Sequence, residues 1–179
     1  GTWSATGSLT QPRIGFALNT TEFGVVVSGG AANNKGLNST EIYDSTLGTW
    51  RVGPKLGDRR LYHASAVIQG VLVVAGGKLA NVAPVTAVER LNATATAWTA
   101  ATSLDVARTG ALFVSLQSGR GLLIGGNNQV GTPEYLDLAA VYDASQDTWT
   151  PIGSLSKGRY GHSAVALSDG SVLVMGGRS

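Results

Sequence analysis

Cysteine is absent from the sequence, and charged residues are scarce. Without cysteine, these 179 residues contain no disulfide, no zinc-thiolate centre and no thiol nucleophile. Charged residues make up 13% of the chain, and the formal net charge of +2 is small and dispersed, which does not favour a nucleic-acid partner. No run of about 18 consecutive apolar residues is present, so the sequence predicts no membrane-spanning helix.

A fourfold repeat is the main feature that is present. Four tryptophans recur at spacings of 47, 48 and 51 residues, and a period of this length indicates a stack or ring of similar units. An arginine follows each tryptophan by ten residues, and a pair of glycines follows it by 26 or 27. These residues are Trp3, Trp50, Trp98 and Trp149; Arg13, Arg60, Arg108 and Arg159; and Gly29, Gly30, Gly76, Gly77, Gly125, Gly126, Gly176 and Gly177. We divide the chain into units at 1–50, 51–98, 99–149 and 150–179.

Each full unit is predicted to contain four short strands. The first strand is rich in alanine and serine, as in residues 163–167, and the second is apolar on both faces, as in residues 71–75. A strand that is apolar on both faces is typical of a sheet packed between two others. Residues 1–7 are predicted to form an outer strand around Trp3, residues 31–38 a polar loop, and the last unit only two strands.

The order of these elements resembles the kelch repeat of β-propellers. A glycine pair closes an apolar strand, Tyr-Asp follows at 43–44 and 142–143, and a tryptophan follows in turn, at a period near 50. The resemblance covers the whole chain and implies an all-β fold: a β-propeller of four-stranded antiparallel blades, with about four blades, the last incomplete, as a segment of a larger propeller. An open ring exposes the apolar faces of its end blades, which predicts association.

The family resemblance implies several functional classes. Kelch propellers include copper radical oxidases, sugar-acid isomerases and non-catalytic proteins that bind other proteins, and the fold does not choose among them. The copper radical site requires a cysteine crosslinked to a tyrosine, which this chain lacks. Because no acid–base pair or phosphate loop stands out, we predict a non-catalytic binding or structural module with no cofactor and no metal. The alternative is a propeller enzyme acting on a sugar or sugar acid, with Arg60, Arg108 or Arg159 holding an anionic ligand at the channel mouth.

The placement of one arginine in every unit favours a structural role, in which the guanidinium binds loop carbonyls or a carboxylate. His63 and His162 lie two units apart, so we interpret each as a partly buried histidine bonded to the backbone. Asp44 and Asp143 share one repeat position and are predicted to bind turn amides.

The loops that follow the second strands vary between units in length and chemistry. Variable loops on a rigid scaffold often carry binding sites, so we predict that this face binds a protein or a glycan. Further blades of the same or another chain are expected as partners of the open ring. The candidate residues are Asn33, Asn34, Lys35, Arg59, Tyr62, Lys78, Asn127, Asn128, Gln129, Glu134, Tyr135 and Tyr160.

Three Asn-x-Ser/Thr sequons, at Asn19, Asn38 and Asn92, fall in predicted turns or loops. They favour an extracellular or cell-surface glycoprotein. A cytoplasmic location is the alternative, since a chain without cysteine fits either side of a membrane.

Overall fold

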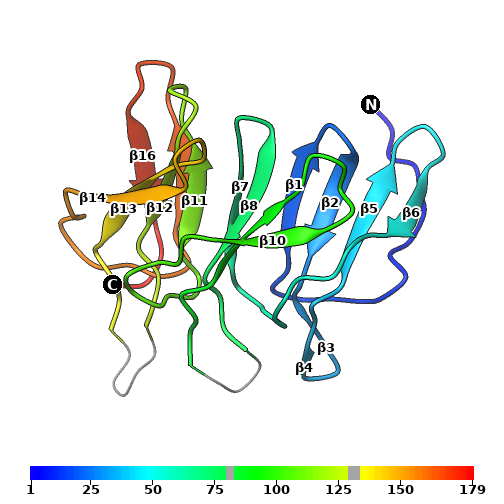
Figure 1. Ribbon diagram of the computed structural model, residues 1–179, viewed down its shortest axis with the longest axis horizontal. Helices are drawn as coiled ribbons and strands as arrows, with labels where there is room; N and C mark the ends of the chain where they lie inside the picture. The colour runs from blue at the N-terminus through cyan, green and yellow to red at the C-terminus, as the bar shows by residue number, and fades with distance from the viewer. Residues whose placement is uncertain (80–82, 129–133) are drawn as a thin grey trace.

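The computed structural model describes residues 1–79, 83–128 and 134–179, which form strands and turns and no helix. Three four-stranded sheets follow one another along the chain (Figure 1). Blade 1 contains β1 (Ala17–Thr21), β2 (Gly24–Ser28), β5 (Thr40–Asp44) and β6 (Thr49–Val52). Blade 2 contains β7 (Ala64–Ile68), β8 (Val71–Ala75), β9 (Val88–Leu91) and β10 (Trp98–Ala101). Blade 3 contains β11 (Leu112–Ser115), β12 (Gly121–Ile124), β13 (Ala139–Asp143) and β14 (Thr148–Ile152).

Two further hairpins complete the described residues: β15 (Ser163–Ala166) with β16 (Val172–Met175), and the short β3 (Ala31–Ala32) with β4 (Lys35–Gly36). Every strand pair is antiparallel, and within each blade the strands lie in chain order. Local turn chemistry supports this meander. Gln69 and Gly70 join β7 to β8 with φ of 50° and 80°, and tight two-residue hairpins require such positive values.

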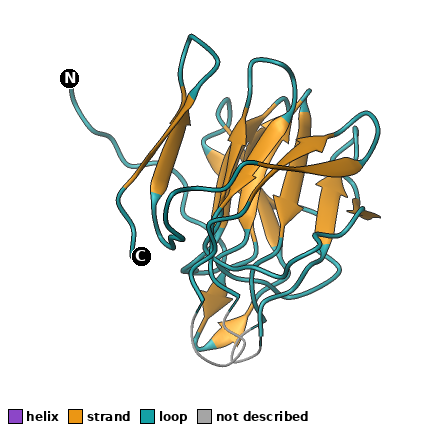
Figure 2. Cartoon of the chain, turned by 90° about the vertical axis from the view of Figure 1, so that its left-hand side faces the viewer, coloured by secondary structure: helices purple, strands orange, loops and turns teal. Residues whose placement is uncertain are grey.

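The inner strands of consecutive blades face one another. Contacts run from β1 to β7, from β7 to β11 and from β11 to β15, and no contact joins β15 back to β1 among the described strands. The blades therefore form an open arc, and the connecting loops lie above and below the sheets, at the ends of the strands (Figure 2). Val165, Leu173 and Met175 on the final hairpin are about half exposed, so one end of the arc presents an apolar face.

The hydrophobic core lies between the sheets rather than within one of them. Val26 and Ile42 of blade 1 pack with Leu72 and Leu91 of blade 2, and a second cluster joins blades 2 and 3 around Phe113. The inner strands β7 and β15 are rich in alanine and serine, as the sequence predicted, whereas β11 carries Leu112, Phe113 and Val114. Strands β8 and β12 are each buried between two sheets, which explains their continuous apolar sequences, whereas β16 on the final hairpin is half exposed.

The glycine pairs link each blade to the next. Gly29 and Gly30 have φ of 59° and 93°, in the left-handed region that favours glycine. The Gly30 N–H donates to the Arg60 carbonyl of blade 2 at 2.8 Å, and a Cβ on Gly29 would lie 2.5 Å from the same oxygen. Gly77 donates in the same way to the Arg108 carbonyl at 2.8 Å, and Gly126 to that of Arg159 at 2.9 Å.

The predictions for residues 1–7 and 31–38 were wrong. Residues 1–7 form no strand, and Trp3 is fully exposed at 102%. The other three tryptophans lie on outer strands that pair with a third strand of their own blade, whereas Trp3 pairs with no strand among the described residues. Residues 31–38, predicted as a loop, contain the β3–β4 hairpin, which Asn33 and Asn34 turn with φ of 48° and 60°.

Candidate binding face and the arginine sites

Arg13 and Arg60 hold the loop end of their own blades together. Arg60 Nη1 donates to the carbonyls of Gly76 and Ala87 at 3.1 and 2.9 Å, and Nη2 donates to Glu89 Oε1 at 2.6 Å. The second oxygen of Glu89 accepts the Gly57 N–H at 2.7 Å. Burial lowers the pKa of Arg60, and the charge of Glu89 opposes that shift. The carboxylate thus joins a buried guanidinium to a backbone amide.

Blade 1 repeats this arrangement with Glu41. Arg13 Nη2 lies 2.6 Å from Glu41 Oε1, and the Thr10 N–H donates to Oε2 at 2.7 Å. Burial alone would raise the pKa of Glu41, but the hydrogen bonds from Thr10 and Arg13 outweigh it, so the pKa is lowered.

Blade 3 keeps the arginine but lacks the carboxylate. Ala140 stands at the repeat position of Glu41 and Glu89, nine residues before the tryptophan. Arg108 is 5% exposed, and its Nη1 reaches the Gly125 and Leu138 carbonyls only at 3.4 and 3.3 Å. No ion pair joins Arg108 to a carboxylate in the part of the chain that the structure describes. Burial lowers the pKa of Arg108, and the nearby charge of Asp105 opposes that shift.

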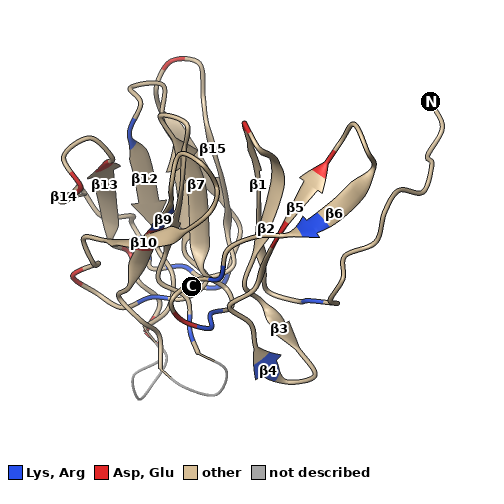
Figure 3. Ribbon diagram, turned by 45° about the vertical axis from the view of Figure 1, so that its right-hand side comes forward, with Lys and Arg blue, Asp and Glu red and all other residues tan. Residues whose placement is uncertain are grey.

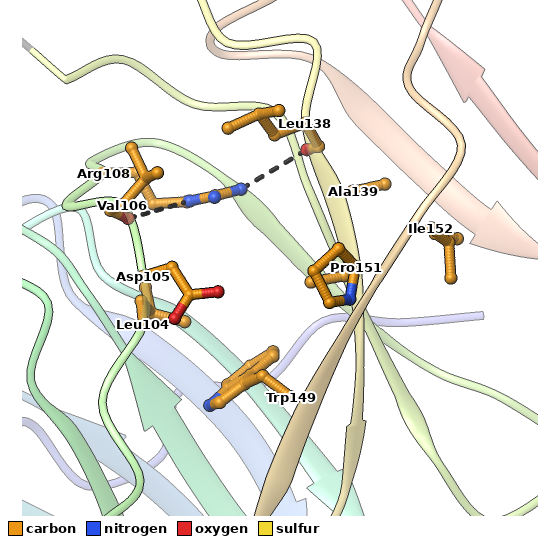
Figure 4. A pocket seen from close by; sticks show the side chains of 10 residues that line it. Leu104, Asp105, Val106, Arg108, Leu138, Ala139, Trp149, Pro151 and Ile152 are labelled. Atoms are coloured by element: carbon orange, nitrogen blue, oxygen red, sulfur yellow. Dashed lines mark hydrogen bonds between the residues drawn. The ribbon is translucent and has the colours of Figure 1, made fainter.

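A hollow of about 230 Å³ opens beside Arg108, between the segment that precedes β11 and the outer strands of blade 3 (Figure 4). Its walls are Leu104, Asp105, Leu138, Trp149, Pro151 and Ile152. The corresponding hollow of blade 2, of about 260 Å³, is lined by Arg60, Glu89, Trp98 and their neighbours. The sequence contains the signal for this difference, since a glutamate stands nine residues before Trp50 and Trp98 and an alanine at that distance before Trp149.

The fourth arginine, Arg159, donates from Nη1 to the Gly176 carbonyl at 2.7 Å. All four guanidinium groups therefore bind carbonyls of their own blades.

The two histidines lie apart and differ in their surroundings. His63 is buried, and its Nε2 lies 3.0 Å from the Ser28 hydroxyl of blade 1 rather than bonded to the backbone as predicted. Burial, and next the charge of Arg60, lower the pKa of His63 to about 3, so the ring is neutral. Ile124 stands where Ser28 stands in blade 1, and the pKa of His162 is lowered by burial and then by Arg159. The described residues contain no cluster of three or more His, Asp or Glu side chains suited to a metal.

Tyr62 is the most unusual residue of the predicted binding face. Its φ is 54°, whereas the same position in the other units is occupied by Gly15, Gly110 and Gly161, with φ of 60°, 61° and 64°. A bulky residue in the left-handed region is a genuine outlier. The ring lies against Gly15, where a Cβ would come 2.9 Å from Tyr62 Cε1, and 39% of the residue is exposed.

Lys78, Tyr135 and Tyr160 lie on the same face. Lys78 Nζ is 5.8 Å from the centroid of the Tyr62 ring, and the rings of Tyr135 and Tyr160 stack with centroids 6.4 Å apart. Burial raises the pKa of Tyr160, with smaller contributions from Tyr62 and Tyr135. We call these four residues, Tyr62, Lys78, Tyr135 and Tyr160, the tyrosine patch.

The remaining candidates divide into two groups. Asn34, Lys35 and Arg59 line a polar hollow of about 510 Å³ beside the β3–β4 hairpin, and Asn33 lines an adjoining one of about 480 Å³. Most lysines and arginines lie at this end of the blades (Figure 3). Beyond the tyrosine patch, Asn128 Nδ2 donates to Glu134 Oε2 at 2.6 Å, and Asn127 bridges Thr109 and Tyr135 through its main chain. Gln129 lies outside the described residues.

The sequons occupy three different settings. Asn19 lies within β1 rather than in a loop, because a two-residue turn lets the strand continue to Thr21, and its Oδ1 accepts the Ser65 hydroxyl at 2.7 Å. Asn38 Nδ2 donates to the Leu56 carbonyl at 3.2 Å. Asn92 lies in the turn after β9, where its Oδ1 accepts the Thr96 N–H at 2.8 Å.

Comparison with known proteins bears on the fold. Human Kelch-like protein 33 is 35% identical over 75 residues, which are 42% of this chain and 14% of the relative. Similarity and sheet topology together support the kelch resemblance. No protein-family model matches the chain. The described part of this chain contains no helix long and apolar enough to cross a membrane.

Proposed function

We propose that this chain is a non-catalytic module that binds a protein partner through its loop face, with the tyrosine patch at the centre of the contact. The observation that carries the proposal is Tyr62, held at a φ of 54° where every other unit has glycine. The left-handed conformation costs a non-glycine residue about 1–2 kcal/mol. Backbone strain of this kind clusters at functional sites.

The chemistry of the patch suits a protein partner. Tyrosine is enriched at interfaces because its ring is large, rigid and apolar while its hydroxyl forms hydrogen bonds. Lys78 adds a cation beside an exposed ring, and Lys35 and Arg59 add positive charge at the neighbouring hollow. A partner segment that combines an apolar anchor with acidic residues fits this surface. The similarity to a human Kelch-like protein supports an interaction role.

The test separates binding from stability. Tyr62→Gly restores the residue found in the other units, so it removes the ring without straining the backbone. The immobilised 179-residue chain is incubated with an extract of its source, and retained proteins are identified by mass spectrometry. A partner held by the wild-type chain and by Arg51→Ala, a change on the exposed outer strand β6, but lost with Tyr62→Gly supports the proposal. A partner that Tyr62→Gly retains with unchanged affinity contradicts it.

We also propose an extracellular setting in which Asn92 carries a glycan. Its place in a turn supports this, because attachment there disturbs no strand pairing. Native protein is digested and its peptides are weighed before and after enzymatic removal of N-glycans. An unmodified Asn92 in native material contradicts the proposal.

A further inference from the structure

We infer that the hollow at Arg108 binds a small organic monocarboxylate, whose carboxylate takes the place that Glu41 and Glu89 occupy in blades 1 and 2. This site is separate from the tyrosine patch and does not depend on the proposed protein-binding function. It rests on blade 3, where the arginine and the backbone N–H that bind a glutamate in blades 1 and 2 are both present, but the glutamate is replaced by Ala140.

Blades 1 and 2 define the two donors. In each, one carboxylate oxygen accepts from the arginine Nη2 at 2.6 Å and the other accepts a backbone N–H, of Thr10 or Gly57, at 2.7 Å. The equivalent donors in blade 3 are Arg108 Nη2 and the Asp105 N–H. Neither has a hydrogen-bond partner among the described residues, so an arginine and an amide are left at the positions that hold a carboxylate in the other blades.

The burial of Arg108 makes an anion favourable at this point. Arg108 is 5% exposed and forms no ion pair among the described residues, although the charge of Asp105 acts on it from nearby. A buried guanidinium that no carboxylate contacts directly is energetically unfavourable. Its hydrogen bonds to carbonyls, at 3.3 to 3.4 Å, are longer than those of Arg60 at 2.9 and 3.1 Å. An incoming carboxylate supplies the charge-assisted bond that the blade itself does not provide.

The residues that line the hollow indicate the chemistry of the part of the ligand that is attached to the carboxylate. Leu138, Pro151 and Ile152 replace Ala87, Ala100 and Ala101 of the blade 2 hollow, which makes the blade 3 hollow more apolar. An apolar cavity of about 150 Å³ is large enough to hold benzene in another protein, so about 230 Å³ accommodates a compact apolar body. Trp149 offers it an aromatic wall (Figure 4).

Asp105 restricts the ligand to a single negative charge. Its exposed carboxylate lies at the hollow, close enough to Arg108 to interact with its charge. A second carboxylate on the ligand would be repelled there. The geometry therefore favours a monocarboxylate with an apolar body, of the size of benzoate, over a dicarboxylate or a phosphate ester.

The test titrates sodium benzoate into the 179-residue chain by isothermal calorimetry, with benzamide as the neutral ligand of the same shape. We expect saturable one-to-one binding of benzoate, with a dissociation constant in the millimolar range or lower, and at least tenfold weaker binding of benzamide. Ala140→Glu supplies the missing carboxylate from β13 and should abolish benzoate binding. A thermal melt of this variant shows that its fold is intact.

Ala93→Glu, in the exposed turn after β9, is the matched control that adds the same charge elsewhere and should bind as the wild type does. The proposal is overturned if the wild-type chain binds no benzoate saturably, or if Ala140→Glu binds it equally well. Binding that occurs only after Asp105→Asn would also overturn it, since Asp105 would then be the anion that Arg108 uses.

Discussion

Blades 2 and 3 surround an arginine and a tryptophan in the same way, yet only blade 2 supplies the arginine with a carboxylate. The hollows differ little in volume, about 260 and 230 Å³, and both blades have four strands in the same order. The Arg60–Glu89 ion pair is therefore not required for a blade to form. The packed apolar strands and the glycine links define the blade, and the ion pair is added to that scaffold. This agrees with the general finding that a buried ion pair is poor evidence of stability.

The largest effect is expected when blade 2 is made to resemble blade 3. Glu89→Ala leaves Arg60 buried without its partner, and removal of one member of a buried pair lowers the free energy of unfolding by about 3–5 kcal/mol. Urea denaturation measures the change. Glu22→Ala, on an exposed turn, is the control and should change the free energy by less than about 0.5 kcal/mol. A loss of under about 1 kcal/mol for Glu89→Ala would show that Arg60 needs no counter-charge.

The reverse change makes blade 3 resemble blade 2. Ala140→Glu gives Arg108 and the Asp105 N–H a carboxylate, and a hydrogen bond to a charged group contributes about 1.5–3 kcal/mol. We expect the free energy of unfolding to rise by that order in urea denaturation. Ala140→Gln, similar in size but uncharged, should gain less. Destabilisation by Ala140→Glu would mean that the two hollows differ in donor geometry.

Acid should affect blade 2 more than blade 3, because blade 2 buries His63 where blade 3 has Ala111. The folded-state pKa of His63, about 3, lies below its ordinary value of 6.5. Between these values the unfolded chain binds more protons, so stability is complete above pH 6.5 and falls as the pH drops. The slope approaches about 1.4 kcal/mol per pH unit. Denaturation at pH 7 and pH 5 measures it, and His63→Gln, which keeps a polar group near Ser28, should flatten it. If the free energy of unfolding falls equally between pH 7 and pH 5 in the wild-type chain and in His63→Gln, the pH dependence comes from groups other than His63.

The smallest expected effect concerns Tyr62, whose counterpart in blade 3 is Gly110. Tyr62→Gly relieves about 1–2 kcal/mol of backbone strain but gives glycine about 0.5–1 kcal/mol of additional unfolded-state entropy. Thermal melts should therefore show unchanged or slightly increased stability. Tyr160→Gly, at a position without positive φ, should instead lower the melting temperature. Equal decreases in melting temperature for Tyr62→Gly and Tyr160→Gly would contradict the claim that the backbone at Tyr62 is strained.

The sequence predicted those features that follow from periodicity. The repeated tryptophans, glycine pairs and apolar strands identified the blades, because each blade must bury the same faces against its neighbours. The prediction was wrong for residues 1–7, since strand propensity does not by itself supply a pairing partner, and Trp3 has none among the described residues. It also placed Asn19 in a loop, whereas β1 continues to Thr21. The end of β1 depends on the length of the turn that follows, which the sequence pattern did not specify. The prediction also overlooked Ala140 and the conformation of Tyr62, which become visible only when each unit is compared with the others residue by residue.

The glycine links between blades all have the same polarity along the chain. The amide of Gly30 is held by the Arg60 carbonyl of the next blade, and the links at Gly77 and Gly126 point the same way along the chain. The main-chain carbonyl of each of these arginines thus binds the preceding blade, while the guanidinium group binds carbonyls of its own blade. Opening of the β15–β16 hairpin would free the Gly126 N–H of blade 3 from the Arg159 carbonyl, while blade 1 stays bound to blade 2. We therefore expect amide hydrogen exchange to begin in the β15–β16 hairpin and then to reach blades 3, 2 and 1 in that order.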